Sequence, residues 1–404
     1  MKQQTMRKRW LYLAVGVVAM LFAGVIYAWS ILKAPLTETF GWTASQLALN
    51  FTLTMCFFCL GGFLGSLTAK KLGTRPVICG GAVLAGLGFV LSSLLSGGSI
   101  GALYLFYGVF AGLGIGCAYI VTISTVGVWF PDKKGLCSGC LMMGFGASTL
   151  LLGNVASAMI SGIGWRTTYQ LLGAAICGVV LVAGLVIHLP GSDVILPQAK
   201  IPKKAGNEVF EAKDYTTAQM LRRFTFWRAF VCIVFLAAVG NTVISFARDL
   251  ALSVGASASL ATTLVGVLAV CNGLGRILTG ALFDAAGRRI TMLCASLTAI
   301  VAAGVTLLAV LLHTVGLCIV GLCLVGLSYG ACPTLTSAFT SAFYGTKYFA
   351  TNFSVMNFNL MGASFMATAA SALLTSYGSY TAPFILLLAL AVAALGLNLS
   401  IRKP

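Results

Sequence analysis

Long apolar stretches follow one another along the whole chain. Each is about 20 residues or longer, the length that an α-helix needs to cross the hydrocarbon core of a bilayer. The alternating ~10-residue segments of a membrane β-barrel are not the pattern here. Twelve stretches occur, at 11–32, 46–68, 76–96, 101–128, 135–160, 168–189, 229–253, 259–283, 290–312, 315–342, 349–376 and 380–400. The sequence therefore predicts an all-α membrane protein with twelve transmembrane helices.

One polar segment divides these stretches into two sets of six. Residues 191–224 contain two prolines, several lysines and four acids, and we expect them to form a cytoplasmic linker. The linker separates an N-terminal six-helix bundle, residues 1–190, from a C-terminal six-helix bundle, residues 225–404.

The two halves look like weak copies of each other. Gly65–Arg75, after the second stretch, corresponds to Gly280–Arg289 after the eighth, and residues 129–134 correspond to 343–347. Two pseudo-symmetric six-helix halves with a site at their interface are typical of secondary transporters.

The charge distribution supports this topology. The chain has 404 residues, of which 59% are hydrophobic and only 8% charged, against about 25% charged in a soluble protein. With a cytoplasmic N-terminus, 21 of the 25 Lys and Arg residues fall in cytoplasmic segments; Lys33, Arg166 and Arg248 fall outside, and Arg276 lies within a span. The net charge of +17 thus follows the positive-inside rule and does not indicate nucleic-acid binding. We expect a multi-pass protein of the bacterial inner membrane with both termini cytoplasmic.

The first stretch is flanked by basic residues, as a signal peptide would be. It is longer than a signal h-region and no small-residue cleavage site follows, so we expect it to be retained.

Enzymatic chemistry is not indicated. The thirteen cysteines are scattered, and the two Cys-x-x-Cys pairs, Cys56/Cys59 and Cys137/Cys140, have no partner histidine, so we expect packing residues and no metal or other cofactor. No nucleophile triad or ATP motif is present, and energy would come from gradients.

Several motifs carry a family resemblance. Gly280-x-Leu282-x-Asp284-x-x-Gly287-Arg288-Arg289 resembles the loop signature of the major facilitator superfamily. Further stretches resemble its oxalate/formate antiporter branch and the related monocarboxylate transporters: Tyr27-Ala-Trp29-Ser30 with Phe40-Gly-Trp42, Trp129-Phe-Pro-Asp-Lys-Lys-Gly-Leu136, and Asp214-Tyr-Thr with Met220-Leu221 and Phe226-Trp227. The resemblance implies the major facilitator fold and transport by alternating access.

Arg276 is the candidate substrate ligand. A cation near the centre of a transmembrane helix costs about 2.5–3.5 kcal/mol, and Arg276 lies about 12 Å along the helix from Asp284 at 1.5 Å per residue. One interpretation is snorkelling or a structural bond to backbone carbonyls. The other is a carboxylate anchor, because a guanidinium matches a carboxylate as a two-pronged donor. The resemblance implies an anion ligand here, with Asn272 one turn earlier on the same face.

A second cation is missing. The family's oxalate carrier has a lysine in the eleventh span, where this chain has Leu360, and a tryptophan where it has Asn357. One buried cation balances one negative charge, and an uncompensated second charge is heavily penalised. We therefore expect a small monocarboxylate of the formate, acetate, lactate or pyruvate class, moved by proton coupling or anion exchange. Two alternatives stay open: an oxalate/formate-type dicarboxylate antiporter, and a membrane sensor of carboxylates without transport.

The resemblance also implies roles for aromatic residues in the spans. Tyr27, Tyr119 and Tyr329 match positions that line the family's cavity, although each can also be a packing residue. Besides the substrate, we expect a proton or counter-anion and membrane lipid as partners, no nucleic acid, and a monomer.

Acidic residues are few enough to assign. Asp249 is either a proton-coupling group or an exposed cap. Asp284, Arg288 and Arg289 resemble the superfamily's cytoplasmic gate, to which Asp132 adds a further contact. In the first-half copy Lys70 stands at the aspartate position, so the latch is expected to depend mainly on the second half.

Overall fold

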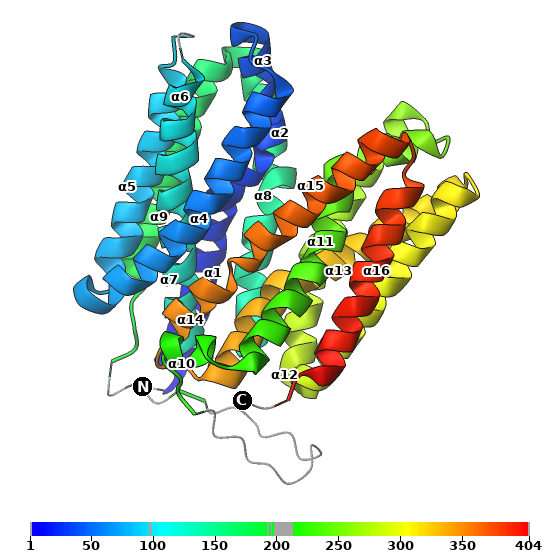
Figure 1. Ribbon diagram of the computed structural model, residues 1–404. Helices are drawn as coiled ribbons and strands as arrows, with labels where there is room; N and C mark the ends of the chain where they lie inside the picture. The colour runs from blue at the N-terminus through cyan, green and yellow to red at the C-terminus, as the bar shows by residue number, and fades with distance from the viewer. Residues whose placement is uncertain (1, 97–98, 192–193, 195, 198–212, 403–404) are drawn as a thin grey trace. The chain divides into compact units, whose positions relative to one another are not determined.

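The computed structural model describes residues 2–96, 99–191, 194, 196–197 and 213–402, and every regular element in these ranges is a helix (Figure 1). The chain separates into two compact units. The first spans Met1–Asp132 and Cys140–Ala199, and the second spans Lys133–Gly139 and Lys200–Pro404. The predicted boundaries at 190 and 225 remain predictions, since residues 198–212 of the linker lie outside the described residues.

The first unit contains six membrane-crossing segments. Its elements are α1 (Lys2–Ala23), η1 (Gly24–Ala28), α2 (Trp29–Leu32), α3 (Ala34–Phe40), α4 (Ala44–Leu72), α5 (Thr74–Ser93), α6 (Ile100–Leu103), η2 (Tyr104–Ala111), α7 (Gly112–Val128), most of α8 (Lys134–Ile163) and α9 (Trp165–Val186). The first crossing runs through α1, η1 and α2, and the fourth through α6, η2 and α7. The segment η2 is a π-helix, a rare form that usually marks a local insertion in a helix.

The second unit contains the other six crossing segments. Its elements are α10 (Thr217–Leu221), α11 (Phe224–Ser253), α12 (Ala258–Leu311), α13 (Val315–Tyr344), α14 (Phe349–Met356), α15 (Asn359–Tyr377) and α16 (Thr381–Ser400), together with the first residues of α8.

The count of twelve follows from the helices and their breaks. In the described part of the chain, ten helices are long and apolar enough to cross a membrane. One of them, α12, is divided at Gly287 (φ 75°, ψ 178°), a backbone conformation that glycine adopts without steric cost, so it supplies two crossings. The helices α14 and α15 together supply the twelfth, as the apolar stretch at 349–376 predicts.

Local sequence explains several helix ends. Thr43 and Gln46 form a capping box that starts α4, and Thr216 and Gln219 form another at α10; each satisfies amides that have no partner inside the helix. Gly164, with φ 81°, separates α8 from α9.

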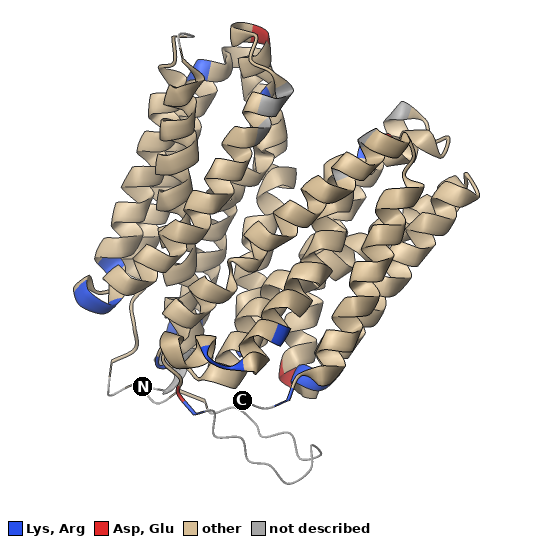
Figure 2. Cartoon of the chain, viewed as in Figure 1, with Lys and Arg blue, Asp and Glu red and all other residues tan. Residues whose placement is uncertain are grey.

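Basic residues gather at one end of each unit's helices (Figure 2). In the first unit they include Lys70, Lys71 and Arg75 around the turn between α4 and α5, and in the second unit Arg288 and Arg289 at the break in α12.

Candidate functional site

Arg276 lies on the protein-facing side of α12. Its side chain is only 4% exposed, whereas Leu274 and Leu278, on the opposite face of the helix, are 50% and 59% exposed. The Nε of Arg276 donates to Oδ1 of Asn272, one turn earlier, at 3.2 Å. The burial argues against snorkelling, and the hydrogen bond joins Arg276 to the residue predicted to lie on the same face, Asn272.

A close crossing of α12 and α13 holds this part of the helix in place. Gly326, Gly330 and Thr334 recur every four residues on α13, so they line one face. A Cβ at Gly330 would touch the carbonyl oxygen of Asn272 and lie 3.1 Å from the backbone nitrogen of Arg276. Thr334 Oγ1 donates to the Arg276 carbonyl at 3.2 Å. Small residues thus bring the two backbones into contact and fix the position from which Arg276 extends.

Tyr329 precedes Gly330 and belongs to the same cluster. Its side chain is buried and lies against Gly240 of α11, where any side chain would collide with the ring. Pro333, four residues later in α13, has no amide to donate to the Tyr329 carbonyl, so that carbonyl lacks its usual helical partner.

Asn357 lies at the break between α14 and α15 and is buried. Beside it, the Asn359 side-chain amide donates to the Met356 carbonyl at 2.7 Å and to Thr336 Oγ1 at 3.3 Å, which replaces backbone bonds lost at the break. Discontinuous helices of this kind commonly form substrate sites in transporters. The second unit therefore contains the predicted residues Arg276, Asn272, Tyr329 and Asn357. A hydrogen bond joins Arg276 to Asn272, and Tyr329 is the neighbour in sequence of Gly330, which lies against the backbone of both.

Tyr27 and Tyr119 pack against the same residue, Phe145, in the first unit. Both rings contact Phe145, with centroids 5.3 Å and 4.8 Å away, and Tyr119 also contacts Phe58 at 5.1 Å. Tyr119 is buried and Tyr27 partly so. The two predicted tyrosines thus share one aromatic cluster, which fits either a cavity wall or a packing core.

Asp249 is not part of the Arg276 cluster. It is exposed near the end of α11. The role of Asp249 in proton coupling remains a prediction.

Asp284 binds the N-terminus of α8. Its Oδ1 accepts from the Gly135 amide at 2.9 Å and its Oδ2 from the Leu136 amide at 2.8 Å. All three residues belong to the second unit, where Gly135 and Gly280 allow the two backbones to touch. A carboxylate at a helix N-terminus is stabilised by both the free amides and the helix dipole.

The other predicted gate residues have separate surroundings. The Arg288 guanidinium lies over the Phe343 ring at 5.1 Å, and Arg289 is exposed. Asp132 pairs with Arg9 of the first unit at 2.8 Å and 3.3 Å. Arg9 is 2% exposed and also lies over the Phe130 ring at 4.9 Å, a structural role that its place in a basic N-terminal run did not indicate.

Asp214 is a capping residue that the sequence reasoning missed. Its Oδ1 accepts from the amides of Thr346 and Lys347 at 3.0 Å and 3.1 Å. The amide of the adjoining Tyr215 donates to the Tyr344 carbonyl at 3.1 Å, and the Tyr215 carbonyl accepts from the Asn352 side-chain amide at 2.9 Å. Asp214 therefore accepts hydrogen bonds from free amides in the segment after α13, just as Asp284 accepts them at the start of α8, the helix that follows α7. The available signal was its place in the Asp214-Tyr-Thr motif.

Metal binding finds no support among the described residues, which contain no group of three or more His, Cys, Asp or Glu side chains placed to hold an ion.

These features define a polytopic helical membrane protein, and comparison with known proteins identifies its class. Residues 11–368 match the family model of the Major Facilitator Superfamily. The chain belongs to this superfamily.

Its relatives agree with the branch that the motifs indicated. The chain is 30% identical over 292 residues to the oxalate:formate antiporter of Oxalobacter formigenes, covering 70% of this chain and 65% of the antiporter. It is 28% identical over 284 residues to an uncharacterized MFS-type transporter of Escherichia coli (strain K12), YhjX, covering 70% and 68%. It is 27% identical over 263 residues to mouse monocarboxylate transporter 12, covering 59% of this chain and 53% of that protein.

Solved structures share the fold. The proton:xylose symporter XylE aligns with a TM-score of 0.76 at 11% identity, over 100% of this chain and 97% of that one. The E. coli fucose:proton symporter FucP aligns with a TM-score of 0.69 at 14% identity, over 98% and 100%. The predicted fold class and family are confirmed: the chain is a multi-pass membrane transporter of a family whose members are not enzymes.

Proposed function

We propose that the protein carries small monocarboxylates, of the formate, acetate, lactate or pyruvate class, by alternating access coupled to a proton or a counter-anion. The observation that carries the proposal is the buried guanidinium of Arg276, which donates to Asn272 where α12 crosses α13 next to Tyr329. The protein would lie in a bacterial inner membrane with both of its termini in the cytoplasm, as the distribution of basic residues favours.

Charge balance supports a singly charged substrate. Among the described residues only Arg9 and Arg276 are buried basic side chains, and Arg9 is paired with Asp132. Lys347 and Arg402 bracket a sequence without lysine or arginine that includes Leu360. A dianion on Arg276 would keep one charge without a basic partner in a low-dielectric interior.

The substrate carboxylate would take both prongs of the guanidinium, and the Tyr329 phenol would add a hydrogen bond and a flat wall for the alkyl part. Contributions of Asn357 from the helix break, and of Tyr27 and Tyr119 from the first unit, are further predictions of the same proposal.

A dicarboxylate exchanger is the second candidate, favoured by the 30% identity to the oxalate:formate antiporter. Because the chain covers only about two thirds of that protein and half of the monocarboxylate transporter, their substrates do not transfer directly, and the two candidates need a binding test.

The test is a thermal-shift panel on purified protein with formate, acetate, lactate, pyruvate and oxalate at one pH. We expect stabilisation by one or more monoacids in the parent and in Arg248→Ala, which removes an exposed arginine. In Arg276→Ala the affinity should fall roughly 30-fold or more, because the partner of a buried charge is lost. Stronger stabilisation by oxalate would favour the second candidate, and an unchanged response in Arg276→Ala would refute the assigned ligand.

Uptake of the labelled acid into proteoliposomes then tests transport itself. Binding without uptake in well-sealed vesicles would support the sensor alternative. Dependence of uptake on an imposed pH gradient, compared between the parent and Asp249→Asn, tests proton coupling and the predicted role of Asp249.

A further inference from the structure

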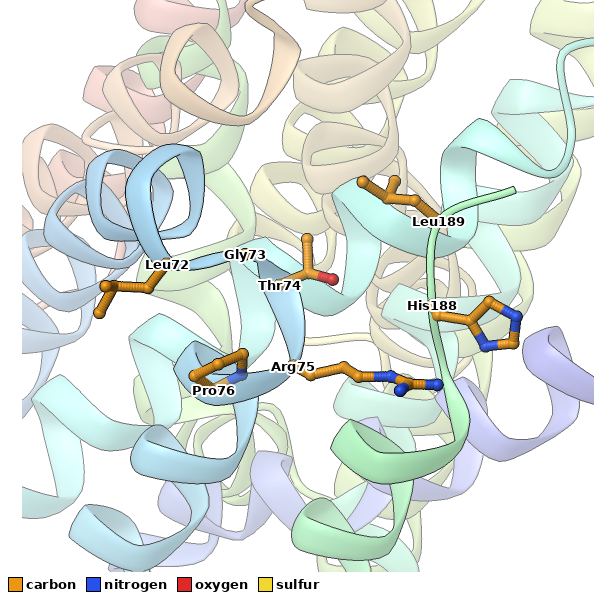
Figure 3. A pocket seen from close by; sticks show the side chains of 7 residues that line it. All are labelled: Leu72, Gly73, Thr74, Arg75, Pro76, His188 and Leu189. Atoms are coloured by element: carbon orange, nitrogen blue, oxygen red, sulfur yellow. The ribbon is translucent and has the colours of Figure 1, made fainter. Parts of the chain in front are cut away.

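Two features carry chemistry of their own outside the residues assigned to the carboxylate site. One is a cavity of about 420 Å³ between the α4–α5 turn and the segment after α9, where the Arg75 side chain extends toward the His188 ring (Figure 3). Arg75 is exposed, so this cavity does not distinguish one anion from another. The other feature is a pair of thiols in the second unit, Cys271 of α12 and Cys323 of α13, and its geometry is specific.

The register of the α12–α13 crossing places the two cysteines opposite each other. Contacts between the helices recur every four residues in the same order along both: Gly326 with Leu268, Gly330 with Asn272 and Thr334 with Arg276. The helices therefore run parallel. On the neighbouring row, a Cβ at Gly275 would lie 3.0 Å from the Leu327 Cα. One helical turn earlier on both helices, the facing positions are Cys271 and Cys323.

The two thiols are also in direct contact. A Cβ at Gly326, one turn after Cys323, would lie 2.8 Å from the Cys271 Cβ, so the Cys271 side chain points at α13. A hydrogen bond joins the two thiols, and both cysteines are free. A disulfide requires Cβ atoms about 3.5–4.5 Å apart, a separation that facing residues reach where two helix backbones touch. The pair therefore lies within closing distance.

Both cysteines lie at a partly exposed, apolar edge of the crossing, within membrane-crossing segments. Val270 and Leu274, which flank Cys271, are 47% and 50% exposed. Val320, one turn before Cys323, is 50% exposed. Since a charged reagent is excluded from such surroundings, an oxidant that reaches the thiols has to be uncharged and soluble in hydrocarbon. Quinones are two-electron oxidants with these properties.

We propose that Cys271 and Cys323 are a redox site, which a quinone oxidises to a disulfide between α12 and α13. The two S–H bonds break and one S–S bond forms. The two protons and two electrons pass to the quinone, which leaves as the quinol. The disulfide is uncharged, as the thiols are, so its formation adds no charge to the apolar region.

The disulfide would also weaken carboxylate binding, a consequence that rests on the proposed function. Closing brings the sulfur atoms from hydrogen-bond distance to about 2.05 Å and draws Cys271, the neighbour of Asn272, toward α13. The crossing has little free space there, because a Cβ at Gly326 would lie only 3.2 Å from the Asn272 backbone nitrogen. We therefore expect Asn272 to shift, and the oxidised protein to bind a monocarboxylate several-fold more weakly than the reduced protein.

The test treats the full chain, reconstituted in lipid vesicles, with a fully substituted benzoquinone, whose ring carries no hydrogen for a thiol to displace. A parallel sample receives ferricyanide, a charged oxidant. After the free thiols are blocked, trypsin releases residues 249–276, in which Cys271 is the single cysteine, and residues 290–347, which contain Cys323. We expect mass spectrometry to find these peptides linked after quinone treatment, unlinked after ferricyanide, and separated again by dithiothreitol.

Serine variants identify the partner of Cys271 within the second peptide. That peptide also contains Cys294, which is exposed, and Cys332, which lies further along α13. Cys323→Ser should abolish the linked peptide, whereas Cys294→Ser and Cys332→Ser should leave it intact. Should Cys323→Ser fail to fold, Cys323→Ala gives the same comparison.

The possible results separate the redox site from its consequence. Absence of the linked peptide after quinone treatment, or its persistence in Cys323→Ser, would overturn the redox site. Equally efficient linking by ferricyanide would overturn the assigned class of oxidant. A thermal-shift titration with a monocarboxylate then compares linked and reduced protein. Equal binding by the two would refute the effect on the carboxylate site, whereas no response in the reduced protein would refute the proposed function and leave the redox site intact.

Discussion

Replacing Gly330 by alanine adds one methyl group at the point where α13 crosses α12. The new Cβ would overlap the carbonyl oxygen of Asn272 and lie 3.1 Å from the Arg276 nitrogen. Both are backbone atoms, so neither can rotate away, and the two helices must separate until the overlap with the Asn272 oxygen is relieved. Overpacking of this kind costs about 1–3 kcal/mol.

The control is Gly266→Ala on α12, where a Cβ meets nothing within 4 Å. Both substitutions gain up to about 1 kcal/mol of helix propensity, so the difference between the two variants isolates the overpacking. At about 2–4 °C per kcal/mol, Gly330→Ala should melt about 2–12 °C below Gly266→Ala in a thermal unfolding assay of purified protein.

The same displacement should weaken monocarboxylate binding, because Asn272 and Arg276 share the shifted backbone. Equal melting temperatures for Gly330→Ala and Gly266→Ala would show that the helices are not in contact at this crossing, and the account of how Arg276 is positioned would have to be abandoned.

Two further predictions concern the ends of the helices. Asp284→Asn keeps an oxygen acceptor but loses the charge that caps α8, so it should lower the melting temperature by a few degrees, about 1 kcal/mol, while Asp249→Asn at an exposed site should not; similar values for both would argue against the cap. Arg9→Gln and Asp132→Asn should each lower the free energy of unfolding by about 1–3 kcal/mol. The double variant should be no less stable than the less stable of the two single variants, which corresponds to a coupling energy above about 0.5 kcal/mol in a double-mutant cycle. Additive losses would mean that the pair does not act as one unit.

Much of the fold was predictable because burial in lipid imposes a length on each helix. The stretch 135–160 lies within α8 and 229–253 within α11, a few residues short at the ends. The π-helical turn at 104–111 and the break at Asn357 were not predictable from the pattern, because a helix that is apolar all round has no periodicity to interrupt.

The candidate site likewise contains residues that the sequence identified and residues that it did not. Arg276 was identifiable because a charge within an apolar stretch is costly, and Asn272 because it is one turn away. The partners that place them were not, because Gly330 and Thr334 lie more than fifty residues further along and glycines are common in this chain. Arg9 and Asp132, 123 residues apart, show the same limit: a pairing across the fold has no local signature.

The divided segment formed by α14 and α15 has a practical consequence for anyone mapping the protein's sidedness. Neither piece alone meets the length and hydropathy of a spanning helix. A count that divides α12 at Gly287 but skips this segment therefore arrives at an odd number, one more than the ten long apolar helices of the described chain. An odd number assigns the chain's two ends to opposite faces of the bilayer. Reporter fusions or antibody tags at the C-terminus, interpreted with such a map, would then invert the assignment of every loop after Tyr344.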